Sequence, residues 1–220
     1  MSTLHIDSIT KSFGKKDILK DIYLSCETGK ISGILGRNGS GKSTLFQIIF
    51  GTMKGNTQFI KFNSEILKNQ SDRRNRIAYL PQHPFLPKNI KIKSLINLFC
   101  NQENARKISE LKLVQPFLNK TPKTLSGGEL RIIEVLLIIY SKADFILLDE
   151  PFHSLSLKIV SELKSIIKQQ AENKGFIISD HQYHDVLDIS DNIFLLSEGY
   201  LKPIKDLNEL QQYNYLPKNI

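Results

Sequence analysis

The sequence contains no tryptophan and only two cysteines, Cys26 and Cys100, in 220 residues. The two cysteines stand alone, without the paired Cys or Cys/His spacing of a zinc or redox motif, which argues against a disulfide scaffold and against a structural metal site. Cys26 falls in a strand-like stretch and Cys100 in a helix-like one. We therefore expect two buried or half-buried free thiols.

Long hydrophobic runs are also missing. No stretch approaches the roughly 18–20 uninterrupted apolar residues that a membrane-spanning helix needs, and the longest runs, around residues 135–140 and 145–148, have the length of core elements. Residues 1–9 alternate between polar and apolar side chains, which is not the pattern of a secretory signal. These absences predict a cytoplasmic protein.

The net charge of +8 could suggest a polyanionic partner, but its distribution does not. The lysines are spread from Lys11 to Lys218, and the densest basic groups, Lys15–Lys16 and residues 73–76, contain no interleaved aromatics for stacking on bases. A solvated basic surface is favoured over a nucleic-acid or anionic-lipid surface. We expect no nucleic-acid partner.

Hydrophobic periodicity predicts an alternation of strands and helices. Leu4, Ile6 and Ile9, and then Ile22 and Leu24, indicate two half-buried strands joined by a turn at residues 11–16. The pattern continues, in chain order, with a strand at 31–35, a helix at 44–50, strands at 58–62 and 76–80, a helical segment at 90–114, a helix at 129–140, a strand at 145–148, a helix at 155–170, and strands at 176–179 and 193–196. This order predicts an α/β fold with a largely parallel sheet, interrupted by a small helical insertion between prolines. The polar tail after Tyr213 is expected to be frayed.

A glycine-rich loop follows the buried strand at residues 31–35. Its residues fit the pattern G-x-x-x-x-G-K-[ST]: Gly36, Arg37, Asn38, Gly39, Ser40, Gly41, Lys42, Ser43 and Thr44. Glycines allow consecutive backbone N–H groups to converge on phosphate oxygens, and the helix that follows presents its positive end to the same anion. Lys42 is predicted to reach the β- and γ-phosphates, and Ser43 to offer its hydroxyl to Mg²⁺. The alternative is a glycine turn without a ligand, which the strand before and the helix after disfavour.

Two carboxylates end the apolar strand at residues 145–148. Ligand chemistry in α/β folds lies at the carboxyl ends of the strands, where Asp149 and Glu150 are expected. Asp149 suits the Mg²⁺ shell, and Glu150 suits polarising an attacking water. The alternative is two solvated turn acids ahead of Pro151.

The sequence Leu125-Ser126-Gly127-Gly128-Glu129 lies between these two motifs and matches the signature of ATP-binding cassette (ABC) ATPases. Over about residues 4–204 the chain resembles that family, which implies a RecA-like P-loop NTPase fold. The resemblance implies one ABC ATPase domain over residues 1–220, with an N-terminal antiparallel β part and a helical subdomain at about 90–125. It also implies ATP and Mg²⁺ as cofactors. In that family the signature residues, here Ser126, Gly127 and Gly128, close over the γ-phosphate held by a second subunit; read alone, they could be only a helix cap.

The resemblance carries over to three further positions. It implies that Phe13 stacks on adenine, that Gln82 contacts Mg²⁺ and senses the transporter, and that His181 contacts the γ-phosphate. The alternatives are an ordinary strand-end aromatic for Phe13, a connecting loop around Gln82, and a metal site of His181 with His184 and Asp185. The metal site is disfavoured because no further ligands cluster there.

The function that the resemblance implies is that of the ATP-hydrolysing subunit of an ABC transporter. Two copies, or one copy and a similar cassette, would sandwich two ATP molecules, with water oriented at Glu150 and His181. Integral membrane permease subunits would hold the protein at the inner face of the cell membrane. The sequences of residues 149–152 and 179–181 are similar to those of branched-chain amino-acid and lipopolysaccharide-transport ATPases.

Two alternatives stay open. One is a soluble ABC-type ATPase of DNA repair or translation, although such proteins resemble tandem cassettes or carry coiled coils or zinc modules that are not seen here. The other is a non-hydrolysing regulatory cassette, supported only by Ser156, which stands where the dimer-contact loop of the family usually has Asp.

Overall fold

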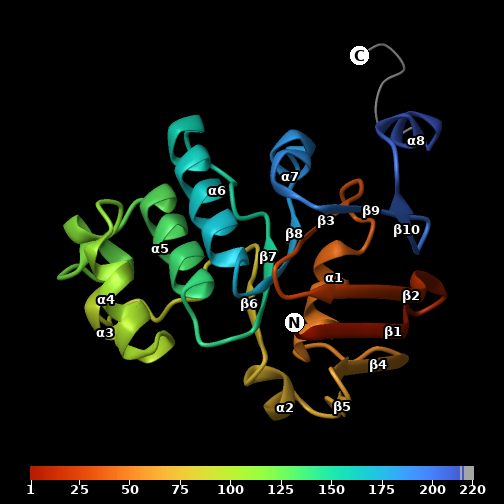
Figure 1. Ribbon diagram of the computed structural model, residues 1–220, viewed down its shortest axis with the longest axis horizontal. Coiled ribbons are helices and arrows are strands. Elements are labelled where there is room, and N and C mark those ends of the chain that lie inside the picture. The colour runs from red at the N-terminus through yellow and green to blue at the C-terminus, as the bar shows by residue number, and fades with distance from the viewer. Residues whose placement is uncertain (214, 216–220) are drawn as a thin grey trace.

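The structure of the chain is a computed structural model that describes residues 1–213 and 215. It contains two sheets (Figure 1). The first is antiparallel, in the order β2 (Lys16–Glu27), β1 (Thr3–Phe13), β4 (Thr57–Phe62), β5 (Glu65–Ile66). The second has the order β10 (Tyr200–Ile204), β9 (Asn192–Ser197), β3 (Ile31–Leu35), β8 (Gly175–Ser179), β7 (Phe145–Asp149), β6 (Ile77–Leu80), and is parallel apart from β10.

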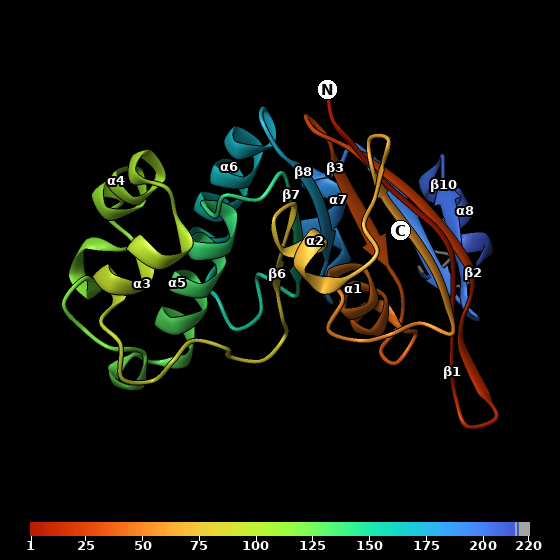
Figure 2. The same cartoon turned by 90° about the horizontal axis from the view of Figure 1, so that it is seen from below.

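The helices cover both faces of the parallel sheet. Helix α1 (Lys42–Phe50) lies between the two sheets, while α5 (Gly127–Ile139) and α6 (Leu157–Ala171) cover the opposite face (Figures 1 and 2). The remaining helices are α2 (Gln70–Arg74), α3 (Ile92–Phe99), α4 (Gln102–Glu110), α7 (Tyr183–Ile189) and α8 (Leu207–Gln212), with 3₁₀ turns at Gln115–Phe117 and Pro122–Thr124. No helix in the described part of the chain is long and apolar enough to span a membrane.

The central strands are buried on both faces, which explains their continuous apolar sequences. In β7, Phe145 and Leu147 pack toward α1 and the antiparallel sheet, whereas Ile146 and Leu148 pack toward α5 and α6. The sheet therefore separates two hydrophobic clusters, and its carboxyl edge is where buried strands emerge into polar loops.

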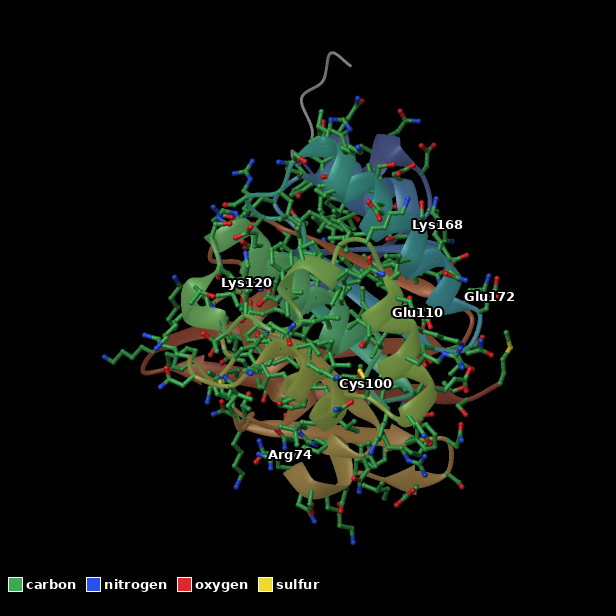
Figure 3. The ribbon with its side chains drawn as sticks, turned by 90° about the vertical axis from the view of Figure 1, so that its left-hand side faces the viewer. Arg74, Cys100, Glu110, Lys120, Lys168 and Glu172 are labelled. Atoms are coloured by element: carbon green, nitrogen blue, oxygen red, sulfur yellow. The ribbon has the colours of Figure 1, made fainter. Side chains whose placement is uncertain are left out.

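The predicted fold class is confirmed, and so are the two buried free cysteines. Cys100 follows the last residue of α3 rather than lying within a helix. Figure 3 labels it on the side of the molecule that carries the helices. The predicted turn at residues 11–16 was too long, because both strands continue until only residues 14 and 15 are left to connect them.

The periodicity missed several short elements: α2, α7, α8, β5 and β10. Each has seven or fewer residues, which is too few to show a helical or strand period clearly. In addition, β10 is a half-exposed edge strand. Helix α1 also begins two residues earlier than predicted, at Lys42. Apart from Tyr215, the tail after Tyr213 lies outside the described residues.

Gly33, in the strand that leads to the glycine-rich loop, gives a test of this packing. A Cβ atom at Gly33 would lie 2.5 Å from Val186 Cγ1 and 2.6 Å from Ser190 Oγ, at α7. Because overpacking a closed core is costly, we expect Gly33→Ala to lower the free energy of unfolding by about 1–3 kcal/mol, measured by urea denaturation. Combined with Val186→Ala, it should cost less than the sum of the two single changes. An additive loss would contradict the close approach as the cause.

Candidate active site

The glycine-rich loop connects the carboxyl end of β3 to the first turn of α1. Gly39 and Gly41 adopt φ angles of +76° and +108°, which side-chain-bearing residues rarely adopt. A Cβ atom on Gly41 would also lie only 2.9 Å from Ile18 Cγ2 on β2. The first N–H groups of α1 have no carbonyl partner one turn earlier within the helix, so this end of the helix suits an anion.

Lys42 lies at the centre of this loop. Its ammonium donates to the carbonyl oxygens of Gly36 at 2.7 Å and Arg37 at 3.2 Å, and the residue is buried. Burial lowers the pKa of Lys42, and the nearby carboxylates of Asp149 and Glu150 oppose that shift. The site therefore holds a desolvated ammonium whose present partners are neutral carbonyls, which a phosphate group could replace.

A cleft of about 410 Å³ lies in front of the loop. It gathers residues that are far apart in the sequence: Phe13, Ile18, Asn38, Gly39, Gly41, Lys42, Ser43, Thr44, Gln82, Glu150 and His181. All but Ile18 are among the residues singled out from the sequence. Phe13, at the end of β1, keeps half of its surface exposed and can present its ring to a ligand.

Three adjacent strands place the reactive side chains in this cleft. Gln82 follows β6, Glu150 follows β7 and His181 follows β8, and these strands are neighbours in the sheet. Gln82 Nε2 donates to Glu150 Oε2 at 2.9 Å, and His181 Nε2 lies 2.7 Å from Glu150 Oε1. Each oxygen of the Glu150 carboxylate is thus oriented by one neighbouring strand end.

The backbone of Glu150 is strained. Its φ of +55° lies in the left-handed region, which costs a residue with a side chain roughly 1–2 kcal/mol. The Glu150 N–H donates to Ser179 O at 2.7 Å, and its carbonyl accepts from Arg131 Nη2 at 2.8 Å. These contacts hold a conformation that aims a buried carboxylate into the cleft.

Asp149 lies beneath the cleft and is fully buried at the end of β7. Its Oδ2 accepts from the Tyr79 hydroxyl at 3.3 Å. Burial raises the pKa of Asp149, and hydrogen bonds from Ser43 and Tyr79 counteract that rise. Its other oxygen, Oδ1, has no hydrogen-bond partner among the described residues.

This unpaired carboxylate oxygen fits a divalent cation. Oxygen donors are the ligands that Mg²⁺ prefers, and Asp149 Oδ1 and the Ser43 hydroxyl, which counteracts the raised pKa of Asp149, are two such donors. Gln82, the third predicted metal contact, instead directs its amide nitrogen to Glu150. His184 and Asp185 make other contacts: the His184 ring lies 3.9 Å from that of Tyr183, and Asp185 Oδ1 is 2.8 Å from Lys164 Nζ.

The signature residues lie elsewhere. Ser126 caps α5, accepting from the Glu129 N–H at 3.3 Å, while its own N–H donates to Glu129 Oε2 at 2.7 Å. Ser126 and Gly127 are exposed, and neither they nor Gly128 lines the cleft. Ser126 therefore does cap α5 within the chain. The exposed turn can in addition meet a ligand presented from outside.

Three loop residues also lie away from the cleft. Arg37 and Ser40 line a different hollow, behind the loop, with residues of β9 and its turn. Gly36 faces the same side, because a Cβ atom there would meet Leu196 O and Ser40 Oγ at 2.7 Å. Ser156, at the departure from the family pattern, precedes α6 without a side-chain cap hydrogen bond.

Sequence reasoning missed two buried residues at this site. Asp180 accepts from the N–H groups of Phe152 and Gln182, both at 3.1 Å, and so holds the loops beside Glu150 and His181. Arg131, on α5, donates to the carbonyl oxygens of Pro81, Asp149 and Glu150. The available signal for Arg131 was a pair of charged residues, Arg131 and Glu134, in the otherwise apolar stretch at residues 130–139.

Comparisons with known proteins agree with the fold and the motifs. A sequence model of the family described as "ABC transporter" matches residues 19–153, more than half of the chain. The lipopolysaccharide export system ATP-binding protein LptB of Escherichia coli K12 is 26% identical over 215 residues, covering 91% of this chain and 89% of that protein.

Solved structures are similar as well. One described as the ATP-binding subunit of an ABC transporter has a TM-score of 0.83 at 20% identity, covering 96% of this chain and 93% of the other. The dimeric structure of a bacterial ABC transporter cassette has a TM-score of 0.78 at 21% identity, covering 93% and 100%. At these identities the structures establish the fold.

Lys42 provides the first test of the site. We expect Lys42→Ala to weaken ATP binding by about 10–100-fold, as for the loss of a charge-assisted hydrogen bond, and to abolish measurable hydrolysis. Equilibrium titration with a fluorescent ATP analogue measures the affinity, with Lys158→Ala on the exposed face of α6 as the control. Unchanged affinity in Lys42→Ala would show that the loop does not hold the phosphates.

Proposed function

The chain belongs to the ABC transporter family, and we propose that its cleft binds ATP with Mg²⁺ and that Glu150 and His181 orient the water that attacks the γ-phosphate. The protein is the ATP-binding and ATP-hydrolysing subunit of an ABC transporter. A soluble role in DNA repair or translation is not favoured by its relatives. The observation that carries the mechanism is the Glu150 carboxylate, held between Gln82 and His181 in the same cleft as Lys42.

Nucleotide binding would use the loop and the start of α1. The phosphates would lie against the backbone N–H groups of residues 36–44, and Lys42 would exchange the carbonyls of Gly36 and Arg37 for phosphate oxygens. Phe13, exposed at the rim of the cleft, would stack on the adenine ring.

Ser43, Asp149 and Gln82 would hold Mg²⁺. When bound, the ion neutralises charge on the β- and γ-phosphate oxygens. Gln82 Nε2 donates to Glu150 in the structure, so the amide oxygen of Gln82 is the atom that would contact the ion. Glu150 Oε2, which Gln82 contacts, would also accept a hydrogen bond from the attacking water. His181 would keep the other oxygen in place.

A complete site would need a second subunit. The signature residues Ser126, Gly127 and Gly128 do not line the cleft of their own chain, and Ser126 and Gly127 are exposed at the start of a helix, where an anion is stabilised. Two copies of the chain, or one copy and a similar cassette, could each present this turn to the nucleotide of the other. A solved cassette of the same fold is described as dimeric, which supports an assembly of two subunits.

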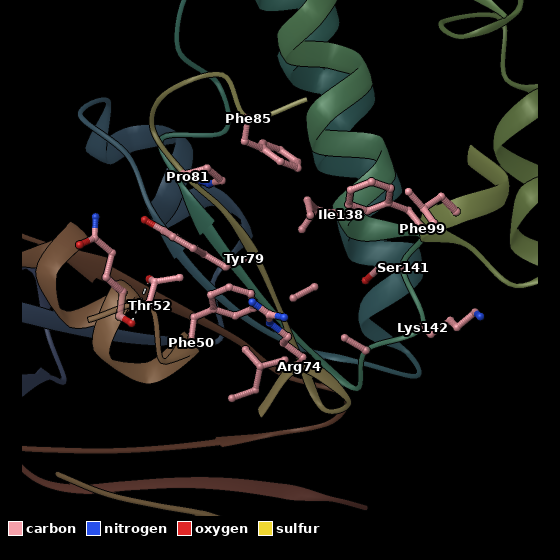
Figure 4. A pocket seen from close by; sticks show the side chains of 15 residues that line it. Phe50, Thr52, Arg74, Tyr79, Pro81, Phe85, Phe99, Ile138, Ser141 and Lys142 are labelled. Carbon is pink, nitrogen blue, oxygen red and sulfur yellow. Dashed lines mark hydrogen bonds between the residues drawn. The ribbon is translucent and has the colours of Figure 1, made fainter. Parts of the chain in front are cut away.

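A large groove of about 1020 Å³ is the proposed contact with the permease. It separates the parallel-sheet core from the helical part, and mostly apolar side chains line it (Figure 4). Phe50 and Tyr79 enter from the sheet side and Phe99 and Ile138 from the helical side. Phe85 also lines it, three residues after Gln82, so an apolar helix from a membrane subunit in this groove would contact the loop that reaches Glu150.

Docking there would hold the protein at the inner face of the cell membrane. Among the described residues there is no helix that could span a bilayer. One relative is named as the ATP-binding protein of a lipopolysaccharide export system. We propose an integral membrane permease as the partner.

Glu150→Gln tests the catalytic assignment. We expect this change to keep ATP affinity and to lower the turnover rate by about 10²-fold or more, because the amide cannot take up the proton of the attacking water. The turnover rate is measured by phosphate release, and size-exclusion chromatography with ATP should show more dimer. Glu162→Gln, exposed on α6, is the control. Near-normal hydrolysis by Glu150→Gln would remove Glu150 from this role.

Leu98→Glu tests the groove. Leu98 lines the groove with 69% of its surface exposed, so a charge there should disturb docking without disturbing the fold. We expect the variant to leave the membrane fraction of permease-containing cells while binding ATP normally. Tyr23→Glu, at a 56% exposed residue on the antiparallel sheet, should stay with the membranes. Equal recovery of both variants, or unchanged recovery after deletion of the permease, would contradict this partner surface.

A further inference from the structure

Arg131 connects three segments of the site through one buried side chain. It lies in the first turns of α5, three residues after Gly128, and only 7% of its surface is exposed. Its Nη1 donates to Pro81 O at 2.8 Å. Its Nη2 donates to Asp149 O at 2.6 Å and to Glu150 O at 2.8 Å. The guanidinium therefore fixes the backbone directly before Gln82 and at Glu150 itself.

Glu134, one helical turn later, completes the arrangement. Its Oε2 lies 3.7 Å from Arg131 Nη1, and its Oε1 accepts from the Phe85 N–H at 2.9 Å. Glu134 is 1% exposed, and burial raises its pKa, opposed by the Phe85 N–H and by Arg131. Because Arg131 holds Pro81 and Glu134 holds Phe85, one helix fixes both ends of the loop that carries Gln82.

These contacts act on the backbone rather than on a ligand. Arg131 does not line the cleft, so it would touch neither a nucleotide bound there nor the reacting water. What it does hold is the carbonyl of Glu150, a residue whose left-handed φ of +55° has to be maintained by its surroundings. Lysine could keep the charge, but it has no planar fork that reaches several carbonyls in fixed directions.

We propose that Arg131 is a positioning residue that sets the Glu150 carboxylate for catalysis and ties it to the signature helix. The proposal rests on the proposed function, in which Glu150 is the catalytic carboxylate. Since α5 begins at the signature turn, which would contact the nucleotide of the other subunit, Arg131 gives each site a direct mechanical connection to its partner's nucleotide. Within one chain, α5 already links the signature turn to Glu150 through Arg131.

The experiment compares Arg131→Lys and Arg131→Met with the unchanged chain. We expect kcat to fall by about 10–100-fold in both, as for a small displacement of a catalytic group, with KM and ATP affinity changed less than about twofold. Arg131→Lys retains the charge facing Glu134, so it tests the idea if Arg131→Met fails to fold. Arg106→Lys and Arg106→Met, at an exposed α4 residue that pairs with Glu110, are the matched controls and should keep normal kcat.

A double variant separates positioning from a general structural loss. If Arg131 acts through Glu150, adding Arg131→Lys to Glu150→Gln should slow turnover no further than Glu150→Gln alone. Normal kcat in Arg131→Lys, a parallel loss of ATP affinity, or additive losses in the double variant would each overturn the inference. Failure of the proposed function looks different, because Glu150→Gln would then hydrolyse ATP at the rate of the unchanged chain.

Discussion

The contact of one carboxylate with two neighbouring strand ends is the interaction on which the site depends. Glu150 meets Gln82 and His181 only because β6, β7 and β8 lie side by side and parallel, so that their carboxyl ends open at one edge. The burial of β7 on both faces fixes where that edge lies. The hydrophobic sheet thus determines the geometry of the polar chemistry, as expected for α/β folds.

Much of this could be predicted from local patterns. Buried parallel strands have continuous apolar sequences, and a phosphate-binding loop needs glycines at fixed positions, such as the left-handed Gly41. The strand order could not be read in this way. Nothing in the residues near Gln82 shows that β6 pairs with β7, which is 65 or more residues away in the sequence. The resemblance to a family supplied what periodicity lacked.

The remaining omissions have a physical cause in common. Arg131 and Glu134 carry charges at positions where the helical pattern predicts apolar core, and their partners are backbone groups with no residue signature. The left-handed conformation of Glu150 could not be predicted either, because the position holds a glutamate and not the glycine that usually marks a positive φ. Such features are set by tertiary contacts that override local preference.

The position of α3 and α4 has an evolutionary consequence. Both helices leave the core after β6 and return before α5, and neither contributes a residue to the nucleotide cleft, although Leu98 and Phe99 line the groove. With this groove as the proposed permease contact, substitutions in α3 would change partner recognition without altering a residue that lines the cleft. Partner recognition and ATP chemistry would then be able to diverge separately within one fold.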